Sequence, residues 1–489
     1  MITEELRALY KSHYGTPPSK AEPLQQAGSG RRYYRLYGET PSRPTVIGVC
    51  GVSTDENEAF IYLSNFFREQ GLPVPQVLDQ SADGLCYLQE DLGDLSLFEA
   101  ISEGRASGSF SQREVQLLTA TIRLLPHIQY CGTQGLAYER CYPVKAFDEQ
   151  SVMWDLNYFK YCFLKATLPD FREDMLENDF TRLARTLVNL DKEQNARTFM
   201  YRDFQSRNIM IKDGAPWFID FQGGRCGPIY YDVASFLWQA KANFPTELRR
   251  QLIQEYINAL GNYRTVPSTD DFWQRLRLFV LFRQMQVLGV YGLRGYFEQK
   301  PHFLQSIPFA LNNIRHLLSE PFDNYPYLSS LLLRLAETDK QKTKQPTNST
   351  EGQLTVTVWS FAYKRGIPAD ESGNHGGFVF DCRAIHNPGR YEQFRHLTGR
   401  DKAVMDFLEQ DGEMARFLEH VHALLDMSVQ RYLKRKFTSL VVCFGCTGGQ
   451  HRSVYAAQKT AEYLAHTYPE ATIRLIHREQ GIHETLNKS

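Results

Sequence analysis

The stretch that decides the fold is FMYRDFQSRNIMI, residues 199–211, followed four residues later by PWFIDFQGG, residues 216–224. Asp203 and Asn208 stand at D-x-x-x-x-N spacing, and Asp220 follows a second apolar run. Phosphoryl transfer needs a carboxylate that accepts the proton of the attacking hydroxyl, and oxygen ligands that hold Mg²⁺ on the phosphates. An Asp alone is common as a helix cap, and an Asn alone is common in a turn. Because all three residues occur in this order between strands, they predict a phosphoryl-transfer site.

The bulk composition sets the class of protein. The chain has 489 residues, which is too long for one ordinary core and predicts two or three domains. Its formal net charge of -1 gives no electrostatic reason to expect a nucleic-acid partner. No stretch approaches the roughly 18 consecutive apolar residues of a membrane span. The nine cysteines are scattered, and the single C-x-x-C at Cys443 and Cys446 lacks the second pair of a zinc site, which indicates reduced thiols. We therefore expect a cytoplasmic protein without a membrane partner.

The clearest division of the chain is TDKQKTKQPTNSTEGQ, residues 338–353, which lacks hydrophobic residues. It predicts a flexible linker between a first domain, residues 1–337, and a second domain, residues 354–489. In the second domain, the strand-like runs LTVTVWSFAY, GGFVFDCRA and TSLVVCFGC alternate with helical stretches, one of which covers residues 401–436. This alternation predicts an α/β domain with a mainly parallel sheet.

The first domain resembles the aminoglycoside phosphotransferase-like kinases, which share the two-lobed protein-kinase fold. The resemblance covers about residues 27–335 and rests on GSGRRYYRL, LQEDLGD, YRDFQSRN, IDFQ, GPIYYDVASFLW and QVLGVYGLRGYF. It is closest to AmgK-type kinases, which phosphorylate the anomeric hydroxyl of N-acetylmuramate or N-acetylglucosamine in cell-wall recycling. The resemblance implies an α+β bilobal domain with an N-lobe of about residues 1–91 and a helical C-lobe of about residues 92–337. It also implies ATP and Mg²⁺ as cofactors and a small-molecule amino sugar as acceptor.

The same resemblance implies a role for each polar position. Asp203 would be the catalytic base, and Asn208 and Asp220 would bind Mg²⁺. Asp232 would brace the catalytic loop, and Asp155 is a candidate for holding sugar hydroxyls, although an acidic residue on a helix is often only solvated. The nucleotide would lie beside the hinge and under the phosphate loop, at Gly28, Ser29, Gly30, Arg31, Arg32, Glu90 and Asp91.

Two positions depart from the kinase pattern. The third strand of kinases carries a lysine that pairs with the α- and β-phosphates, but TVIGVC has none. Either the domain is inactive or other cations act, and Arg31, Arg32 and Arg35 are candidates because a guanidinium holds phosphate oxygens at least as well as an ammonium. The resemblance implies that AmgK-type kinases also lack this lysine, so we predict activity. Tyr201 occupies the usual histidine position, whose role is mainly structural.

A second phosphate-binding pattern is CFGCTGGQHRS, residues 443–453, directly after an apolar strand. Ser453 opens a helix, and backbone N–H groups freed by glycines at a helix start bind anions, to which Arg452 can add a bidentate contact. Cys446 and Arg452 also have the C-x5-R spacing of cysteine phosphatases, in which a thiolate attacks phosphorus. The loop is therefore either a phosphatase or a ligand-binding site.

The second domain resembles the C-terminal domain of RapZ, a bacterial RNase adapter and sensor of glucosamine 6-phosphate. The resemblance covers about residues 354–479 and rests on VWSFAYKRGIP, FVFDCRAIHNPG, LTGRDKAVMDFL and GCTGGQHRSVYAAQKTAEYL. It implies binding of a phosphorylated amino sugar rather than catalysis. The implied pocket residues are Cys446, Thr447, Gly448, Gly449, His451 and Arg452, with Lys364, Asp381 and Arg383 as wall residues.

RNA binding would require a basic patch, since phosphate neutralisation dominates RNA affinity. From Leu354 onward there are 17 Lys and Arg against 15 Asp and Glu, and the run at Lys434–Lys436 is the only candidate. Nucleic acid is therefore not an expected partner. The favoured hypothesis is an ATP-dependent amino-sugar kinase fused to a phosphosugar-binding domain. The alternatives are a RapZ-like regulatory or RNA-binding adapter with a non-catalytic kinase module, and a cysteine phosphatase.

Overall fold

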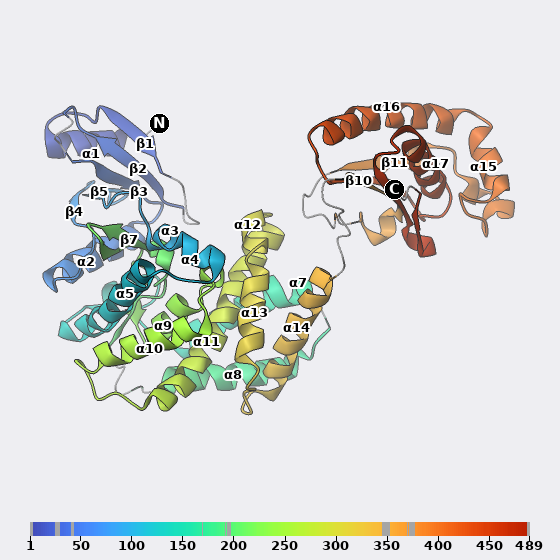
Figure 1. The fold of residues 1–489 in the computed structure, drawn as a ribbon. Helices are drawn as coiled ribbons and strands as arrows, with labels where there is room; N and C mark the ends of the chain where they lie inside the picture. Colours follow the sequence, from blue (N-terminus) through green and yellow to red (C-terminus); the bar gives the residue numbers. More distant parts are fainter. Residues whose placement is uncertain are drawn as a thin grey trace. The chain divides into compact units, whose positions relative to one another are not determined.

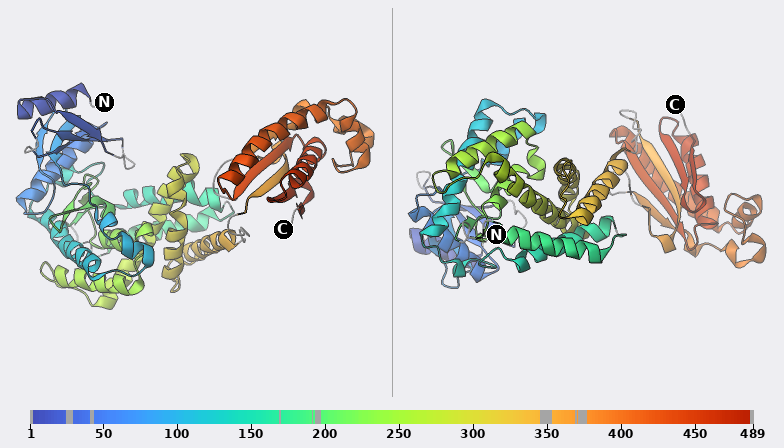
Figure 2. Two further views of the ribbon diagram at one scale, coloured as in Figure 1. Left: turned by 45° about the horizontal axis from the view of Figure 1, so that its top comes forward. Right: turned by 90° about the horizontal axis from the view of Figure 1, so that it is seen from below.

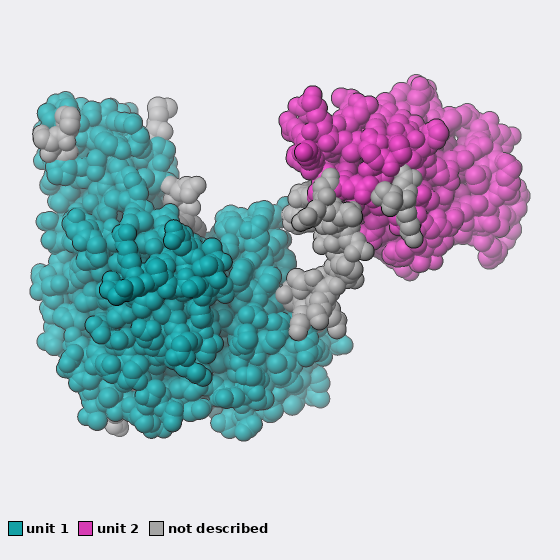
Figure 3. All heavy atoms as spheres, viewed as in Figure 1, with its two compact units in different colours: residues 1–344 teal, residues 345–489 magenta. Residues whose placement is uncertain are grey.

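A computed structural model describes residues 3–24, 30–40, 44–168, 170–190, 192, 197–344, 353–368, 370 and 377–486, with backbone only for residues 338–344. The chain forms two compact units, Met1–Lys344 and Gln345–Ser489, which Figure 3 colours separately. Each unit has its own hydrophobic core. They are described one after the other.

The first unit begins with a lobe built on an antiparallel five-stranded sheet of order β1-β2-β3-β5-β4, drawn in blue in Figure 1. Helix α1 (Glu4–Tyr14) covers one face of this sheet, and helix α2 (Thr54–Glu69) covers the other. Every residue of β3 is therefore buried, which explains why VIGVC shows no alternation of apolar and polar residues. The strands are β1 (Lys20–Pro23), β2 (Arg32–Tyr37), β3 (Val46–Cys50), β4 (Val77–Gln80) and β5 (Cys86–Glu90).

The second lobe of this unit is helical, and its centre is α11, which packs against α6, α9 and α13. Because α11 is surrounded by other helices, it carries buried residues all round. The helices of the lobe are α3 (Leu97–Ala100), α4 (Ser102–Ser107), α5 (Gln112–Cys131), α6 (Glu149–Phe159), α7 (Lys165–Thr167), α8 (Glu173–Asn189), α9 (Tyr230–Leu237), α10 (Thr246–Leu260), α11 (Thr269–Gly292), α12 (Pro301–Leu304), α13 (Ile307–Leu317) and α14 (Pro326–Lys344). The expected two-lobed, protein-kinase-like fold is confirmed.

Two small antiparallel pairs in the helical lobe carry the catalytic loop. β6 (Phe199–Met200) pairs with β9 (Arg225–Cys226), and β7 (Ile209–Lys212) pairs with β8 (Ala215–Phe218). The loop after β6 ends in a 3-10 turn, Ser206–Asn208, and the loop after β8 contains Asp220. The ends of β6 and β8 thus deliver both predicted acids to one region.

The second unit is an α/β domain with the sheet order β11-β12-β10-β13-β14. The right view of Figure 2 shows its strands side by side, in orange to red. All pairs are parallel except β13 with β14, so the expected mainly parallel sheet is confirmed. The strands are β10 (Thr355–Ala362), β11 (Phe378–Asp381), β12 (Ser439–Cys446), β13 (Thr472–His477) and β14 (Ile482–Thr485), and the helices are α15 (Lys402–Glu409), α16 (Glu413–Lys434) and α17 (Arg452–Thr467).

Two expectations about segments need correction. The stretch 401–436 is not one helix, because Gly412 adopts φ 74° and separates α15 from α16. The predicted linker 338–353 begins inside a helix, since α14 continues to Lys344, and residues 345–352 lie outside the described residues. Within the described ranges, no helix has the length and the apolar character that crossing a bilayer requires.

Candidate functional site

The three residues that the sequence predicts for phosphoryl transfer lie together in the first unit. Asn208 Nδ2 donates a hydrogen bond to the Asp220 carboxylate at 3.1 Å and another to the backbone oxygen of Asp203 at 2.9 Å. Both bonds use the amide nitrogen of Asn208, so its Oδ1 stays available as an acceptor or metal ligand. Asp220 and Arg202 both adopt the left-handed backbone region, with φ of 67° and 75°. Such strain in non-glycine residues concentrates at functional sites.

The electrostatics of this site suit a divalent cation. Burial raises the pKa of Asp220 above its ordinary value, and the neighbouring negative charge of Asp203 raises it further. A hydrogen bond of 2.7 Å from Gln222 Nε2 opposes this shift only in part. Mg²⁺ prefers oxygen ligands and is commonly bound by one or two carboxylates together with substrate phosphates. The Asp220 carboxylate and the Asn208 amide oxygen fit that description.

The catalytic loop is held by two buried side chains. Asp232, on α9, accepts hydrogen bonds of 2.9 Å from the backbone N–H groups of Tyr201 and Arg202, as its bracing role requires. Burial raises the pKa of Asp232 to about 7. The Tyr201 hydroxyl donates to the backbone oxygen of Ile219, next to Asp220, so the residue in the histidine position ties the two loops together.

Cationic side chains surround Asp203 and Asp155. Arg283 Nη2 lies 3.7 Å from a carboxylate oxygen of Asp203, and Arg202 Nη2 lies 3.4 Å from Asp155. The second oxygen of Asp155 accepts a hydrogen bond of 2.8 Å from Gln286. Asp155 therefore belongs to the same region as the predicted base. Both of its oxygens already have partners in the protein.

Arg31, one of the three candidates for the role of the missing lysine, lies close to the helix acid Glu56. The Arg31 side chain is 1% exposed, and Nη2 donates to the backbone oxygen of Glu56 at 3.0 Å and lies 3.4 Å from the Glu56 carboxylate. Glu56 lies in the first turn of α2. The positive charge of Arg31 also lowers the pKa of Asp220, whereas the charge of Glu56 raises it. A cation, a helix acid and the metal-site acid thus lie within electrostatic reach of one another, as the lysine, the glutamate and the DFG aspartate do in kinases.

The other predicted nucleotide residues are arranged differently. Arg35 pairs with Asp91 at 2.6 Å and with Asp94 at 2.7 Å, so it stabilises the hinge instead of facing phosphates. Glu90 pairs with Lys212 at 2.5 Å. Arg32 is exposed, and Gly30 is described, but Gly28 and Ser29 lie outside the described residues.

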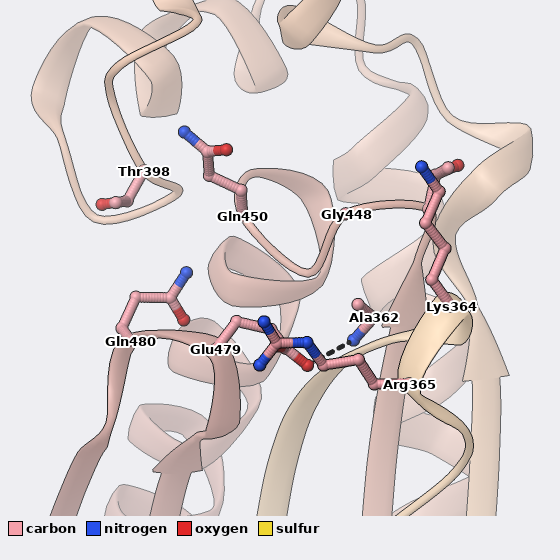
Figure 4. Close-up of a pocket in the computed structure, with 9 residues that line it drawn as sticks. Ala362, Lys364, Arg365, Thr398, Gly448, Gln450, Glu479 and Gln480 are labelled. Carbon is pink, nitrogen blue, oxygen red and sulfur yellow. Dashed lines mark hydrogen bonds and ion pairs between the residues drawn. The ribbon is translucent and has the colours of Figure 1, made fainter.

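The second unit contains a cavity of about 380 Å³ at the carboxyl ends of its central strands (Figure 4). Its lining includes Lys364, Thr447 and Gly448, which the sequence singled out. It also includes residues that the sequence analysis missed: Ala362, Arg365, Thr398, Gln450, Glu479 and Gln480. Glu479 accepts a hydrogen bond of 3.2 Å from the backbone N–H of Ala362 and pairs with Arg365 at 3.0 Å. Gly449 adopts φ 66°, and a Cβ there would meet Ala362 N at 2.8 Å, so this turn requires glycine.

The remaining loop residues hold the loop in its conformation beside the cavity. Cys446 Sγ accepts a hydrogen bond of 3.2 Å from Gly449 N and lies 3.1 Å from Ser453 Oγ. Arg452 Nη1 donates to the backbone oxygens of Arg383 and Ile385, both at 2.8 Å. Buried His451 contacts the backbone oxygen of Phe394 at 2.8 Å through Nε2. Cys446, His451 and Arg452 therefore use polar atoms in fixing the loop and are absent from the cavity lining.

The predicted wall residues Asp381 and Arg383 pair with each other. Arg383 Nη2 lies 2.6 Å from Asp381, and its guanidinium stacks 4.2 Å from the centre of the Tyr363 ring. The Arg383 side chain is 52% exposed. Neither residue lines the cavity.

Both units match known protein families. Residues 21–272 match the model described as phosphotransferase enzyme family, and residues 354–481 match the RapZ C-terminal domain. A nucleotide-binding protein of Albidiferax ferrireducens is 36% identical over 153 residues, or 31% of this chain and 49% of that protein. A nucleotide-binding protein of Xanthomonas euvesicatoria pv. vesicatoria is 32% identical over 263 residues, or 49% of this chain and 90% of that protein. The chain spans about half the length of the first of these relatives.

Solved structures similar to the chain include two kinases of small molecules. The amicoumacin kinase hAmiN, in complex with AMP-PNP, Ca²⁺ and Ami, aligns with 15% identity and a TM-score of 0.43, over 66% of this chain and 89% of that chain. The choline kinase of Cryptosporidium parvum Iowa II aligns with 10% identity and a TM-score of 0.42, over 67% of this chain and 90% of that chain.

Proposed function

The chain belongs to the phosphotransferase enzyme family, and from this premise we propose that its first unit is an ATP-dependent kinase acting on a hydroxyl of a small amino sugar. The acceptor class is that of N-acetylmuramate and N-acetylglucosamine, as the AmgK-type resemblance implies, in cell-wall sugar recycling. The second unit binds a phosphorylated amino sugar. The observation that carries the proposal is the Asn208 amide between the Asp203 backbone and the Asp220 carboxylate.

Each residue of the site has a place in this reaction. The Asp203 carboxylate accepts the proton of the acceptor hydroxyl while the hydroxyl oxygen bonds to the γ-phosphorus and ADP leaves with the electron pair of the broken bond. Arg283 Nη2 lies 3.7 Å from a carboxylate oxygen of Asp203 and helps to position it. Asp220 and Asn208 would hold Mg²⁺, which when bound offsets the negative charge of the phosphates. Arg31, oriented by Glu56, would contact the nucleotide phosphates.

The cavity of the second unit supports binding rather than catalysis. A phosphate group would meet the Lys364 and Arg365 side chains and the backbone of Thr447 and Gly448, which precede α17. A phosphatase needs Arg452 to hold the phosphoryl group, but Nη1 of Arg452 donates to two backbone oxygens. We therefore propose a phosphosugar-sensing role for this unit and no hydrolysis.

The test is an acceptor screen on the full chain. ATP consumption is measured with Mg²⁺ and with N-acetylmuramate, N-acetylglucosamine or glucosamine, and thermal shift is measured with glucosamine 6-phosphate. Turnover on a free sugar, together with a thermal shift from the phosphosugar alone, is expected. Absence of turnover with every sugar, while the phosphosugar still binds, would leave a regulatory adapter with a non-catalytic kinase module.

A further inference from the structure

We propose that the acceptor carries an anionic group, a carboxylate or a phosphate, and that a basic cluster of Arg105, Arg207, Lys241 and His302 binds it. This inference rests on the proposed kinase function and narrows its substrate class. The cluster combines α4, the catalytic-loop turn, a 3-10 turn at Ala240–Ala242 and α12. No motif in the sequence connects these four positions.

The geometry of the cluster is organised around the ring of Phe98 on α3. The Arg105 guanidinium lies 3.4 Å from the ring centre, and the Arg207 guanidinium lies 4.9 Å from it. Arg105 Nε donates to the backbone oxygen of Phe98 at 3.0 Å, and Nη1 reaches the backbone oxygen of Lys241 at 3.4 Å. The Phe98 ring thus holds the two guanidinium groups close together, and Arg105 also binds the backbone of Lys241. Figure 1 labels α3, α4 and α12 in the helical lobe.

The charges of the cluster repel one another. Burial lowers the pKa of Lys241, and the charges of Arg207 and Arg105 lower it further. Burial also lowers the pKa of His302, and Lys241, Arg207 and Lys300 add to that shift. In the part of the chain that the structure describes, none of the four side chains forms an ion pair. Glu99 acts on Arg105, but its carboxylate is bound by Ser96 in the cap of α3.

Holding like charges together costs free energy, and the half-buried Arg105 and Lys241 have no ion-pair partner among the described residues, whereas Arg207 and His302 are exposed. A bound anion removes that cost, and guanidinium and ammonium groups converging from different elements are the usual means of binding carboxylates and phosphates. The cluster is therefore built for an anion that the protein does not itself supply.

The position of the cluster assigns this anion to the acceptor. Arg207 directly precedes Asn208 in the catalytic loop. Tyr291, on α11, is within electrostatic reach of both Arg207 and Arg283, and Arg283 lies 3.7 Å from Asp203. All four side chains belong to the helical lobe, whereas Arg31 and the hinge belong to the sheet lobe or its exit. The anion would thus lie on the same side as the base that receives the hydroxyl proton.

Matched acceptors test the proposal and separate the two sources of charge. N-acetylmuramate differs from N-acetylglucosamine by a lactyl ether that carries a carboxylate, and N-acetylglucosamine 6-phosphate differs from it by a phosphate. The ratio of kcat/KM for each anionic sugar to that for N-acetylglucosamine is measured in the wild type, in Lys241→Gln and in Arg207→Gln. Arg113→Gln is the control, because Arg113 is an exposed residue on α5, outside the cluster.

The wild type is expected to prefer one of the two anionic sugars by about tenfold or more, and each substitution in the cluster should reduce that preference by about tenfold. Arg113→Gln should leave it unchanged. The arm that responds, carboxylate or phosphate, identifies the source of the charge. Equal use of neutral and anionic sugars, or a preference that survives both substitutions, overturns the inference and leaves the kinase function intact.

If the protein turns over none of these sugars, a binding measurement tests the cluster instead. Thermal shift caused by N-acetylmuramate or N-acetylglucosamine 6-phosphate is compared between the wild type and Lys241→Gln. Because the second unit is itself proposed to bind phosphosugars, only the part of the shift that depends on Lys241 reports on the cluster. A Lys241-dependent shift without turnover refutes the kinase function and supports the cluster, whereas shifts equal in both proteins refute the cluster.

Discussion

The loop at residues 201–208 and the loop at residues 446–453 look alike in sequence, because each places candidate catalytic groups after a strand. They differ in what those groups already bind. Burial raises the pKa of Asp220, and the neighbouring negative charge of Asp203 raises it further. Arg452, by contrast, donates to two backbone oxygens of its own domain. This difference supports the proposal that the first loop is catalytic and that the second loop binds a ligand.

The largest expected effect comes from Asp203→Asn in the first loop. Loss of a general base typically lowers the rate by about 10³-fold, so kcat for ATP consumption should fall by about that factor while nucleotide binding persists. The thermal unfolding midpoint should stay near the wild-type value, because the Asp203 side chain is 43% exposed. Kinetics and nucleotide-induced thermal shift are measured on the same preparation.

The control for this change is Asp213→Asn. Asp213 is exposed in the turn between β7 and β8 at φ 53°, a conformation that asparagine also tolerates. Its substitution should leave kcat within about twofold of the wild type. If Asp203→Asn were as active as Asp213→Asn, Asp203 would not be a catalytic base. The first loop would then not differ from the second in catalytic role.

Arg31→Met tests whether Arg31 takes the role of the kinase lysine in the first unit. If Arg31 replaces the kinase lysine, its loss should lower kcat/KM for ATP by about 100-fold, the usual cost of one electrostatic contact to the reacting group. Arg31→Lys should recover part of that loss, because an ammonium keeps the charge opposite Glu56. Methionine fills the buried space, and a measured unfolding midpoint shows whether the variant folds. A full loss in both variants, or none in either, would contradict the assignment.

Asp232→Asn tests whether the first loop depends on a buried carboxylate. Asparagine can accept only part of the hydrogen bonding to Tyr201 and Arg202, so unfolding free energy should fall by about 2 kcal/mol at neutral pH. Chemical denaturation of the wild type and the variant at pH 7 measures the difference. A variant as stable as the wild type would show that the loop is held by other contacts.

The pH dependence of that stability has a definite sign. Burial raises the pKa of Asp232 from 3.8 to about 7, so the folded protein binds this proton more tightly than the unfolded chain. The stability from that proton is fully present below about pH 4 and is lost as the pH rises through about 7. Asp232→Asn should therefore lose less stability than the wild type between pH 4 and pH 7. A larger loss in the variant would contradict the raised pKa.

The fold could be predicted from sequence where a pattern is local. Alternation of strands and helices after residue 354 indicated a parallel sheet, since each crossover needs a helix between strands. The break at Gly412 was missed because the apolar spacing is helical on both sides of it, and only the φ of 74° separates α15 from α16. The first residues of the predicted linker were misassigned for a similar reason, since their polar composition fits both a solvated helix and a linker.

The candidate site likewise contains some residues that a local pattern predicts and others that only the folded structure brings together. Asp203, Asn208 and Asp220 lie within one short segment, so their spacing predicted the site. The sequence did not predict the contact of Glu56 with Arg31. Glu56 is one of several acids at the start of α2, and only the packing of that helix brings it to Arg31. The carbonyl partners of Arg452 could not be predicted, because backbone oxygens carry no sequence signature.

The smallest effect is expected from Cys446→Ser in the second loop. Because Cys446 is 3% exposed and supports the loop through Gly449 and Ser453, its thiol should contribute to stability and not to hydrolysis. Affinity for glucosamine 6-phosphate should change by less than about threefold, and neither protein should hydrolyse p-nitrophenyl phosphate. The matched control is Cys443→Ser, since Cys443 is buried on the same strand and packs in a separate cluster with Phe361 and Val441. Hydrolysis by the wild type that disappears in Cys446→Ser but persists in Cys443→Ser would make the second loop a catalytic one, because only a reactive thiolate requires that particular cysteine.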